Sequence, residues 1–429
     1  MRYRQKHWSP SVVLTGGFLL LLAVCLSAPV VALDRTVVPG AGSLQRAIDQ
    51  AGPGDRLLLQ DGVYAGSVII DRPLELLGKV SSIIDGEGEG RVITVAAPDV
   101  VVRAVTVRNS GASLATEDSG IFVTVDGDRS LIDGNRLEHN LIGVYLKGPE
   151  SVVVRRNVIV GSTDPHVNDR GNGVHLWNSP GSVVEDNDIR YGRDGIFVTT
   201  SRNNVFRGNR LRDLRFAIHY MYTNDSEVSD NRSVGNHVGY ALIYSDQLQI
   251  IDNVSDGDRD RGLFFNYANN SDIKGNRVTG GAEKCVFIYN ANINHIHGNT
   301  FADCRIGIHF TAGSERNQVY ENAFVNNRTQ VKYVGTRFIE WSVDGRGNYW
   351  SDNPAFDLDD DGIADQPYQP NDLVDQIVWR HPMAKLLLNS PAVQVLRWAQ
   401  SEFPALHPGG VTDSAPLMEL PQQTVQSNG

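Results

Sequence analysis

Short apolar segments with an alternating pattern recur through the middle of this chain. In seven of them the first and third residues are apolar, while the residue between them varies in polarity. These segments are Ile121–Val123, Val144–Leu146, Val174–Leu176, Ile196–Val198, Ile218–Tyr220, Leu263–Phe265 and Ile308–Phe310. Because side chains two residues apart lie on the same face of a strand, this period of two predicts β-strands and not helices.

Two columns of residues repeat along the same region. Nine asparagines are separated by 22 or 23 residues, except for one interval of 30 residues: Asn135, Asn157, Asn187, Asn209, Asn231, Asn253, Asn276, Asn299 and Asn322. A second column, mostly glycine, precedes the apolar segments at Gly120, Gly143, Gly173, Gly195, Ala217, Gly239, Gly262, Cys285 and Gly307. A fixed period of this length is typical of a solenoid, in which each coil buries its apolar face against its neighbours.

The content of one repeat decides which solenoid is expected. A period of about 22 residues holds two or three short strands joined by Gly, Asn or Asp turns and leaves no room for a helix. We therefore predict an all-β fold, a right-handed parallel β-helix over residues 67–350. The repeated asparagines are interpreted as an inward ladder, in which each side-chain amide satisfies backbone groups of the next coil.

The segments on either side of the solenoid differ from it in pattern. Residues 33–66 contain Ser43–Ala51, which is predicted to be an amphipathic helix that caps the first coil and ends at Gly52. The period ends after Asn348. We then expect an acidic loop region over residues 351–380, a segment of helical character over 381–407 that Pro391 divides, and a disordered tail over 408–429.

Residues 1–32 resemble a secretory signal peptide. Three basic residues precede an apolar run, and small or short residues precede a cleavage site after Ala32. An uncleaved membrane anchor is the alternative. Removal of the three positive charges takes the formal net charge from −11 to −14, which argues against nucleic acid as a partner.

The mature chain would contain two cysteines, Cys285 and Cys304. They are offset by about three residues in coil register. Along a strand this offset corresponds to roughly 10 Å, which is beyond the reach of a disulfide. We therefore expect two buried thiols.

An acidic motif lies beyond the last repeat. Asp357, Asp359, Asp361 and Asp365 take positions 1, 3, 5 and 9 of an EF-hand-like loop, with Gly362 at its tight turn. Tyr368 stands where such a loop carries its bidentate glutamate. The spacing predicts a single structural Ca²⁺, and a solvated acidic turn is the alternative.

A candidate copper site lies on one of the predicted strands. His219 and Met221 are two residues apart, so both are expected on the same outward face, and imidazole with thioether is a donor pair suited to Cu(I). His175 is a further candidate in the same column. It lies two coils away, near 10 Å, which is too far to share one ion without movement. The alternative is an exposed histidine within a wall of aromatic residues.

The outward aromatic column has a second interpretation. Aromatic rings along a β-helix groove bind sugars in polysaccharide lyases and epimerases, and the one long interval contains Asp164-Pro165-His166, which is similar to the Asp-Pro-His of alginate epimerases. Asp164, His166, Asp169, Arg170 and His175 would supply the acid, the base and the charge neutraliser. A polysaccharide-binding or -modifying protein is thus an alternative function. A third interpretation is a rod-shaped protein whose aromatic column is an interface for protein partners.

The C-terminal segment carries apolar residues that suit docking. They are Leu386, Leu387, Leu388, Val395, Trp398 and Phe403. The run is too short and too polar to span a bilayer. It is expected to lie against a membrane protein or at the membrane interface, or to form a helical cap on the last coil.

Several longer blocks resemble one family. They are Arg215–Tyr222, Gly345–Asp352, Asp357–Tyr368, Asn371–Asp375 and Lys385–Gln394. In these blocks the chain resembles the NosD family of nitrous-oxide reductase maturation proteins, which are β-helix proteins of the carbohydrate-binding and sugar-hydrolase-like repeat superfamily.

The resemblance implies a periplasmic protein that is not an enzyme. It implies attachment to an ABC-type complex with NosY as the membrane subunit and NosF as the ATPase. It further implies that copper passes from the chaperone NosL towards the copper–sulfur centre of nitrous-oxide reductase. The family offers no fixed ligand motif, so His219 and Met221 remain candidates from their own chemistry.

Overall fold

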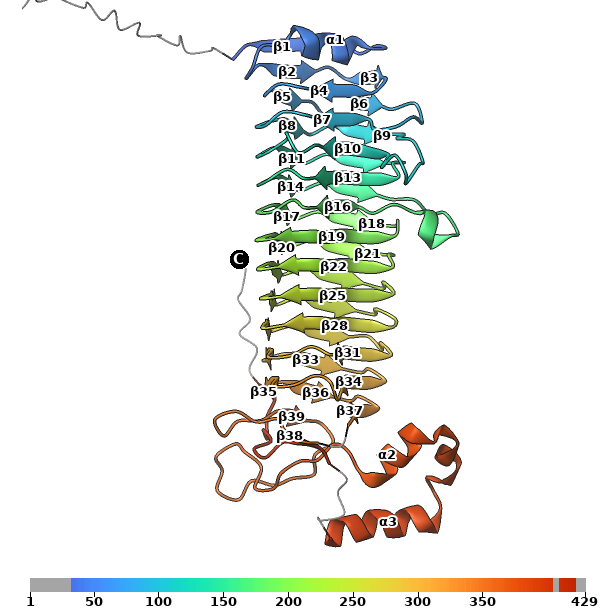
Figure 1. Ribbon diagram of the computed structural model, residues 1–429, viewed down its shortest axis with the longest axis vertical. Coiled ribbons are helices and arrows are strands. Elements are labelled where there is room, and N and C mark those ends of the chain that lie inside the picture. The colour runs from blue at the N-terminus through green and yellow to red at the C-terminus, as the bar shows by residue number, and fades with distance from the viewer. Residues whose placement is uncertain (1–31, 336, 404–408, 422–429) are drawn as a thin grey trace, which may run out of the picture. The chain divides into compact units, whose positions relative to one another are not determined.

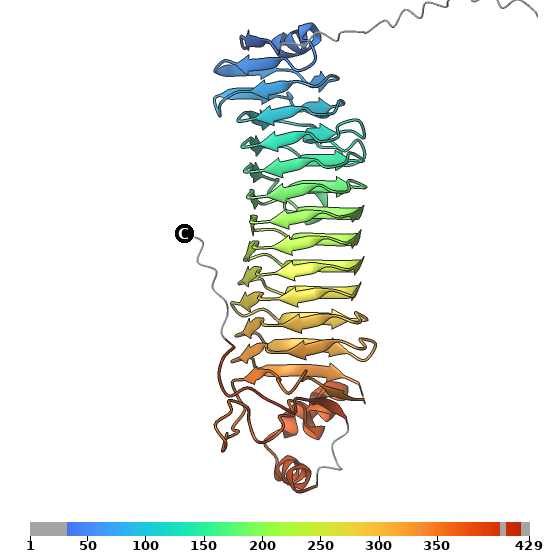
Figure 2. The same cartoon turned by 90° about the vertical axis from the view of Figure 1, so that its left-hand side faces the viewer.

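The computed structural model describes residues 32–335, 337–403 and 409–421, and in this part the chain forms a parallel β-solenoid (Figure 1). Three parallel sheets of 13, 12 and 13 strands follow the stack of coils, and each coil contributes one strand to each sheet. Figure 2 shows the strands of successive coils lying one above another. The predicted fold is confirmed, whereas the predicted signal peptide lies outside the described residues except for Ala32.

The first sheet contains β1 (Asp34–Val37), β2 (Arg56–Leu59), β5 (Glu75–Leu77), β8 (Val101–Arg103), β11 (Leu131–Asp133), β14 (Val153–Arg155), β17 (Val183–Glu185), β20 (Val205–Arg207), β23 (Glu227–Ser229), β26 (Gln249–Ile251), β29 (Asp272–Lys274), β32 (His295–His297) and β35 (Gln318–Tyr320). The second sheet contains β4 (Val68–Ile70), β7 (Ile93–Val95), β10 (Ser119–Val123), β13 (Ile142–Lys147), β16 (Val174–Trp177), β19 (Asp194–Arg202), β22 (Phe216–Asn224), β25 (Val238–Asp246), β28 (Arg261–Asn269), β31 (Lys284–Tyr289), β34 (Ile306–Thr311) and β37 (Thr329–Val334). The third sheet contains β3 (Gly62–Ala65), β6 (Ser82–Asp85), β9 (Thr106–Arg108), β12 (Arg136–Glu138), β15 (Val158–Val160), β18 (Asp188–Arg190), β21 (Arg210–Arg212), β24 (Arg232–Val234), β27 (Val254–Asp256), β30 (Arg277–Thr279), β33 (Thr300–Ala302), β36 (Ala323–Val325) and β39 (Tyr349–Trp350).

The core is a continuous apolar column between the three sheets. In one coil it takes Phe206 from the first sheet, Ile218 and Tyr220 from the second and Leu211 from the third, all fully buried. Successive coils repeat this pattern because the strands pair in parallel with side chains of the same face in register. Apolar burial between coils is therefore the main stabilising term.

The asparagine column forms the predicted ladder. The backbone N–H and the side-chain Nδ2 of Asn209 both donate to Oδ1 of Asn231, each at 3.0 Å, and Nδ2 also donates to the carbonyl of Val184 at 2.8 Å. The same pattern runs from Asn135 to Asn348. Each buried amide thus links neighbouring coils and leaves no turn donor unsatisfied at this corner.

The ladder ends on a residue from near the end of the chain. Oδ2 of Asp413 accepts from the backbone N–H of Asn348 at 2.7 Å and from Nε1 of Trp350 at 2.8 Å. Residues 409–421 include β40 (Gly410–Thr412), which pairs with β38 (Phe338–Glu340). The prediction of disorder is wrong for residues 409–421, because this polar segment supplies the acceptor that the last coil needs. Residues 408 and 422–429 lie outside the described part.

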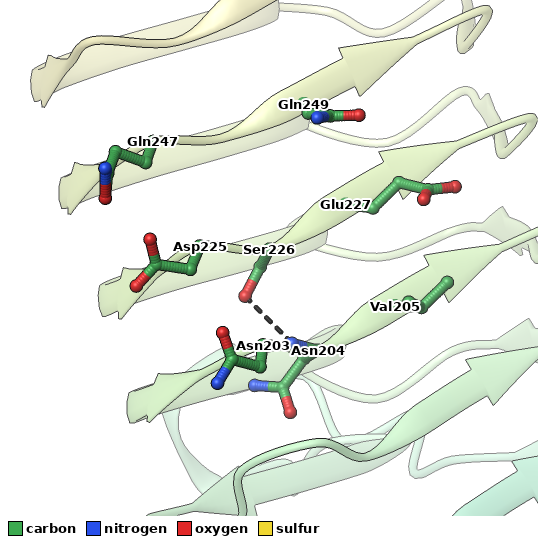
Figure 3. A pocket seen from close by; sticks show the side chains of 8 residues that line it. All are labelled: Asn203, Asn204, Val205, Asp225, Ser226, Glu227, Gln247 and Gln249. Atoms are coloured by element: carbon green, nitrogen blue, oxygen red, sulfur yellow. Dashed lines mark hydrogen bonds between the residues drawn. The ribbon is translucent and has the colours of Figure 1, made fainter.

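A corner follows each strand of the second sheet. Figure 3 shows the shallow cleft at this corner in the middle coils, lined by Asn203, Asn204, Val205, Asp225, Ser226, Glu227, Gln247 and Gln249. The backbone N–H of Asn204 donates to Oγ of Ser226 at 3.1 Å, so small polar side chains tie the coils together here as well. Seven of the eight residues that line the cleft are polar or charged.

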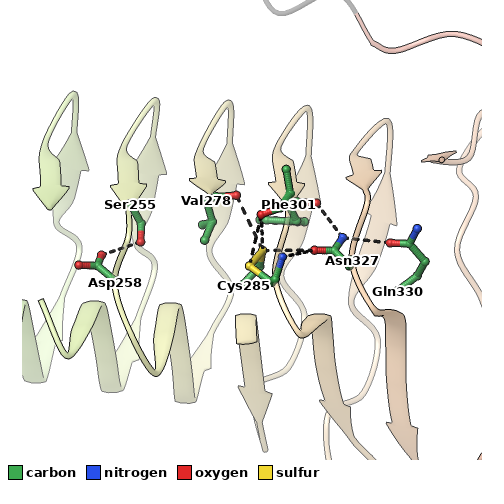
Figure 4. The surroundings of a disulfide bond; sticks show 9 residues. Ser255, Asp258, Val278, Cys285, Phe301, Asn327 and Gln330 are labelled. Atoms are coloured by element: carbon green, nitrogen blue, oxygen red, sulfur yellow. Dashed lines mark hydrogen bonds between the residues drawn. A yellow bond between two sulfur atoms is a disulfide. The ribbon is translucent and has the colours of Figure 1, made fainter. Parts of the chain in front are cut away.

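The two cysteines form a disulfide, which corrects the expectation of free thiols. Their Cα atoms lie 5.6 Å apart (Figure 4). Cys285 lies in β31, whereas Cys304 lies in the turn between β33 and β34. The offset of three residues therefore runs around a corner of the solenoid and not along a strand, and both side chains are buried.

Helical segments precede the first coil, interrupt one interval of the stack and follow the last coil. α1 (Ser43–Gln50) buries Leu44 and Ile48 in the same core. Its N-cap is Gly42, without a side-chain cap. A short 3-10 helix, η1 (Val167–Asp169), lies in the long interval, and α2 (Leu373–Arg380), η2 (Pro382–Leu387) and α3 (Pro391–Glu402) follow the last coil.

The segment after residue 380 is helical and is divided before Pro391, as the sequence predicts. The short helix α2 was not expected. It begins at a capping box in which the side chains of Asp372 and Asp375 accept from each other's backbone N–H groups. Across the described residues no helix is both long and apolar enough to cross a bilayer.

Candidate copper site

One outward row of the second sheet carries two of the three candidate copper ligands, His175 and His219. Its members are in direct strand register: Phe122, Tyr145, His175, Phe197, His219, Ala241, Phe264, Phe287, His309 and Lys332. Neighbouring rings are in contact, with centroids 4.2 Å apart for Tyr145 and His175 and 4.9 Å apart for Phe197 and His219. The predicted aromatic column therefore exists, and Ala241 interrupts it next to His219.

His219 points away from the core, as predicted, but it is not exposed. Its two neighbours in β22, Ile218 and Tyr220, are buried in the core, yet only 7% of the His219 surface is accessible. The ring of Phe216 covers its edge, with ring centroids 4.7 Å apart at an angle of 71°. The alternative of an exposed histidine is therefore wrong, because Phe216, the first residue of the same strand, packs against the His219 ring.

A buried carboxylate holds His219 in place. Nδ1 of His219 lies 3.1 Å from Oδ2 of Asp194, one coil away. Nε and one terminal nitrogen of Arg215 donate to the two carboxylate oxygens at 2.8 and 2.6 Å. The Arg215 guanidinium also lies over the Phe216 ring, 4.5 Å from its centroid. Asp194, Arg215 and His219 thus form one fixed cluster.

The charge state of Asp194 decides which nitrogen of His219 carries the proton. Burial opposes ionisation of this carboxyl, but hydrogen bonds from His219 and Arg215 outweigh it and hold the pKa of Asp194 below its usual range. An ionised carboxylate only accepts hydrogen bonds, so Nδ1 of His219 must be the donor. Nε2 then presents a lone pair, and no described residue donates to it.

This arrangement is the one that orients metal-binding histidines. In such sites a carboxylate accepts from one ring nitrogen and leaves the other free to bind the ion. Met221 lies two residues further along β22 on the same side of the strand and is partly accessible. Imidazole and thioether together suit Cu(I). The local chemistry of His219 and Met221 therefore fits a small copper site.

His175 is separated from this pair. The ring of Phe197 lies between His175 and His219, with centroids 4.8 Å from the first and 4.9 Å from the second. Burial lowers the pKa of His175 to about 4, so the ring is neutral at physiological pH. It stacks on Tyr145 and its Nδ1 has no hydrogen-bond partner. The structure therefore does not place His175 where it could share one copper ion with His219 and Met221.

The acidic loop gathers three of its four predicted ligands. Carboxylate oxygens of Asp357, Asp359 and Asp361 all lie within 4.8 Å of one another. Repulsion from Asp361 raises the pKa of Asp359. Asp365 instead accepts from the backbone N–H of Leu358 at 2.9 Å. The loop is therefore arranged as a partial cation cage.

The inserted interval also gathers charged groups. Donor atoms of Asp164, His166 and Asp169 lie within 4.8 Å of one another on an exposed loop that includes η1. Arg170 donates to the backbone carbonyl of Asp164. His175, expected to join them, is instead stacked on Tyr145.

The predicted docking residues lie on η2 and α3 or beside them. Five of them are exposed: Leu386, Leu387, Val395, Trp398 and Phe403. The sixth residue, Leu388, is partly buried and so less exposed than the other five. The segment thus presents an apolar surface rather than burying it against the last coil.

Comparison with known proteins gives the family. The family model described as "Periplasmic copper-binding protein (NosD)" matches residues 156–354. The "Probable ABC transporter binding protein NosD" of Pseudomonas aeruginosa is 43% identical over 379 residues, which cover 85% of this chain and 89% of that protein. Its namesake from Stutzerimonas stutzeri is 40% identical over 383 residues, covering 86% of this chain and 88% of that protein. The chain belongs to the NosD family.

The family description and the names of the two relatives indicate a general role. The family description is that of a periplasmic copper-binding protein, and both relatives are named as binding proteins of an ABC transporter. The residues of the Asp194 cluster and Met221 all lie within the part of the chain that the NosD model matches.

Solved structures with a similar fold have varied roles. The surface adhesin PfbA of Streptococcus pneumoniae has a TM-score of 0.53 at 11% identity, covering 71% of this chain and 89% of that one. A family 28 exopolygalacturonase of Yersinia enterocolitica has a TM-score of 0.52 at 10% identity, covering 67% and 78%. At such identity the likeness shows the fold that this NosD-family chain shares with them and no common activity.

Sequence reasoning missed Asp194 and Arg215. Both lie one or two positions before members of the repeated column, Gly195 and Ala217, so the coil register was sufficient to place them beside His219. The available signal was an acidic residue one position before Gly195 and a basic residue two positions before Ala217, in successive coils.

Proposed function

We propose that this protein is a periplasmic accessory component of an ABC-type complex that delivers copper to nitrous-oxide reductase or supports assembly of its copper–sulfur centre. In this proposal NosY is the membrane subunit, NosF is the cytoplasmic ATPase, NosL is the copper donor and nitrous-oxide reductase is the client. Membership of the NosD family and the copper-binding description of that family support the proposal.

The observation that carries the proposal is the hydrogen bond between Asp194 and His219. With Nδ1 bonded to Asp194, Nε2 is the ring nitrogen of His219 that is left for a metal ion, and Met221 lies two residues further along β22. Two soft or borderline donors give Cu(I) a low coordination number, which leaves room for a donor or acceptor protein to add its own ligand. Copper would then pass by exchange of one ligand at a time, without release into solution.

The exposed apolar surface of η2 and α3 is the proposed attachment to the membrane subunit. Leu386 is 80% exposed and Trp398 is 61% exposed, values that favour a partner surface for both. Conformational change in the membrane subunit, driven by ATP hydrolysis, would alter the orientation or copper affinity of the solenoid through this contact.

The acidic loop is proposed to hold one structural Ca²⁺. Mutual repulsion among Asp357, Asp359 and Asp361 would be relieved by a bound cation. Calcium should therefore raise the melting temperature of the wild-type protein, and Asp359→Asn should remove that increase. Equal melting curves in excess calcium and in chelator would contradict this proposal.

A Cu(I) titration tests the proposed function. The protein from residue 33 onwards would compete with a chromophoric chelator for Cu(I), beside the variant His219→Ala/Met221→Ala. We expect a stoichiometric site in the wild type that the double variant loses.

The matched control is His295→Ala/Met383→Ala, which removes an exposed histidine and an exposed methionine elsewhere. It should bind copper as the wild type does. Failure of the wild type to compete for copper would refute copper handling by this protein alone.

A further inference from the structure

Three tyrosines form an exposed ladder on the second sheet. Tyr222, Tyr244 and Tyr267 occupy the same position in three successive coils, and 39% to 53% of their surface is accessible. Their rings stack with centroids 5.2 and 4.9 Å apart and interplanar angles of 13° and 8°. We call Tyr222, Tyr244 and Tyr267 the tyrosine ladder.

The backbone of this ladder does not favour tyrosine. The φ angles are 55°, 49° and 52°, in the left-handed region that bulky side chains rarely adopt. The equivalent positions in nearby coils have the same conformation: Thr200 and then Asn178 before the ladder, with φ of 54° and 47°, and Asn290 after it, with φ of 48°. Asparagine tolerates this region well. Three consecutive tyrosines here therefore indicate selection for their side chains rather than for the turn.

The geometry of the rings suits a protein partner better than a sugar. Sugar rings stack on open aromatic faces, but in the ladder both faces of Tyr244 are covered by its neighbours. Because both of its faces are covered, the exposed part of Tyr244 lies at its ring edge. Tyr267 is further fixed by Asn290, whose Nδ2 donates to its hydroxyl at 2.8 Å. Rigid, exposed tyrosines lose little entropy on binding and are enriched at protein interfaces.

The ladder adjoins the candidate copper ligand and an acidic cleft. Tyr222 follows Met221 directly in β22, and Ile243 occupies the place of Met221 in the next coil. On the other side lies the cleft of Figure 3, where Asp225 and Glu227 make no ion pair with any described residue. A partner covering this area would contact Met221, the ladder and the cleft together, and its rim over the cleft would be basic.

We propose that the tyrosine ladder is the docking surface for the protein that exchanges Cu(I) with His219 and Met221. The inference rests on the proposed function, since it assigns a place to the partner of that same copper site. The ladder positions the partner so that its copper ligands reach Met221, and the acidic cleft fixes its orientation through basic residues.

The test compares association and copper binding in the same variants. The ladder variant is Tyr222→Asn/Tyr244→Asn/Tyr267→Asn, which introduces the residue type that Asn178 and Asn290 provide at the same corner of other coils. Tyr191→Asn is the matched control, because Tyr191 is also exposed and has a φ of 61° but lies at a different corner. The probe is NosL loaded with Cu(I), and its association is measured by sedimentation velocity at low salt.

We expect the ladder variant to bind the probe roughly tenfold or more weakly than the wild type. Its affinity for Cu(I) in the chelator competition should be unchanged, and Tyr191→Asn should behave as the wild type in both. Association of the ladder variant equal to the wild type would overturn the inference even if copper binding stands. The inference would also be overturned if the wild type did not associate with the probe. It would likewise be overturned if the wild type bound an alginate oligomer and the ladder variant did not. Failure of the wild type to bind Cu(I) would refute the proposed function separately.

Discussion

At the scale of single residues, the important feature is a carboxylate that acts through a histidine. Asp194 is buried and is held ionised by Arg215 and His219. It does not reach the proposed metal position itself, and its role is to fix the orientation and protonation of the imidazole. His219 without Asp194 would be one more ring in an aromatic row.

Replacement of Asp194 tests that role. Asp194→Asn keeps the shape but removes the charge that holds the proton on Nδ1, so the affinity for Cu(I) should fall by about 10- to 100-fold. Chelator competition measures this directly. Asp256→Asn, which removes an exposed ion pair with Arg232, should leave the affinity unchanged. Equal copper affinity in Asp194→Asn and the wild type would show that Asp194 is only structural.

The pKa of a second buried carboxyl, that of Asp258, is shifted upwards, opposite to the shift of Asp194. Asp258 is fully buried and accepts from Oγ of Ser233 and of Ser255, each at 2.6 Å, and from the backbone N–H of Asn236 at 2.7 Å. Burial raises its pKa despite these hydrogen bonds. A raised pKa in the folded state stabilises the protein at low pH, and that stabilisation is lost as the pH rises through the folded-state pKa.

Asp258→Asn should therefore stabilise the protein at neutral pH. The amide keeps the acceptor for Asn236 and removes a buried negative charge. The difference from the wild type should disappear below about pH 4, where an unperturbed aspartate is itself protonated. Urea unfolding of the variant and the wild type, at neutral pH and below about pH 4, measures this difference in the free energy of unfolding. A lower stability of Asp258→Asn at neutral pH would contradict the account.

At the scale of elements, closure of the last coil depends on a distant segment. The asparagine ladder needs an acceptor beyond Asn348, and Asp413 supplies it from a position 65 residues further along the chain. The same carboxylate oxygen accepts from the indole of Trp350. The segment around β40 is thus part of the fold rather than an appendage.

Removal of that acceptor should destabilise the C-terminal coils. Asp413→Ala leaves the N–H of Asn348 and Nε1 of Trp350 without a partner, and each unsatisfied buried donor costs about 1–3 kcal/mol. Hydrogen exchange should show loss of protection at β39 and β36 first. Asp413→Asn retains an acceptor oxygen and should recover most of the protection. Unchanged exchange in Asp413→Ala would refute this role.

Sequence periodicity gave the coils and their register because a solenoid repeats one local environment many times. The asparagine ladder and the aromatic row were predictable on that basis, whereas the helical character of the segment around Pro391 was predicted from that segment's own sequence. The disulfide and the closure by Asp413 were not, because both depend on how the chain bends at a corner or returns from a distance. The burial of His219 was missed as well, since it depends on how the ring of Phe216, at the start of β22, packs against the imidazole.

At the scale of the whole molecule, the second sheet combines several features on its outward face. Strand β22 carries both candidate copper ligands, His219 and Met221, and the nine-residue strands β22, β25 and β28 carry the tyrosine ladder at the position that follows the Met221 row. A regular stack thus keeps the proposed copper site and the proposed partner surface in a fixed relation over several coils. The proposal that this protein passes copper between partners requires such a fixed relation.

The most direct measurement is X-ray absorption spectroscopy of the Cu(I)-loaded protein and of two single variants. The account predicts nitrogen and sulfur scatterers in the wild type, loss of the sulfur shell in Met221→Leu and loss of the nitrogen shell in His219→Ala. Because Cys285 and Cys304 are joined in a disulfide, the sulfur must come from a thioether. A sulfur shell that persists in Met221→Leu, or a wild-type spectrum with only nitrogen and oxygen donors, would contradict the central claim.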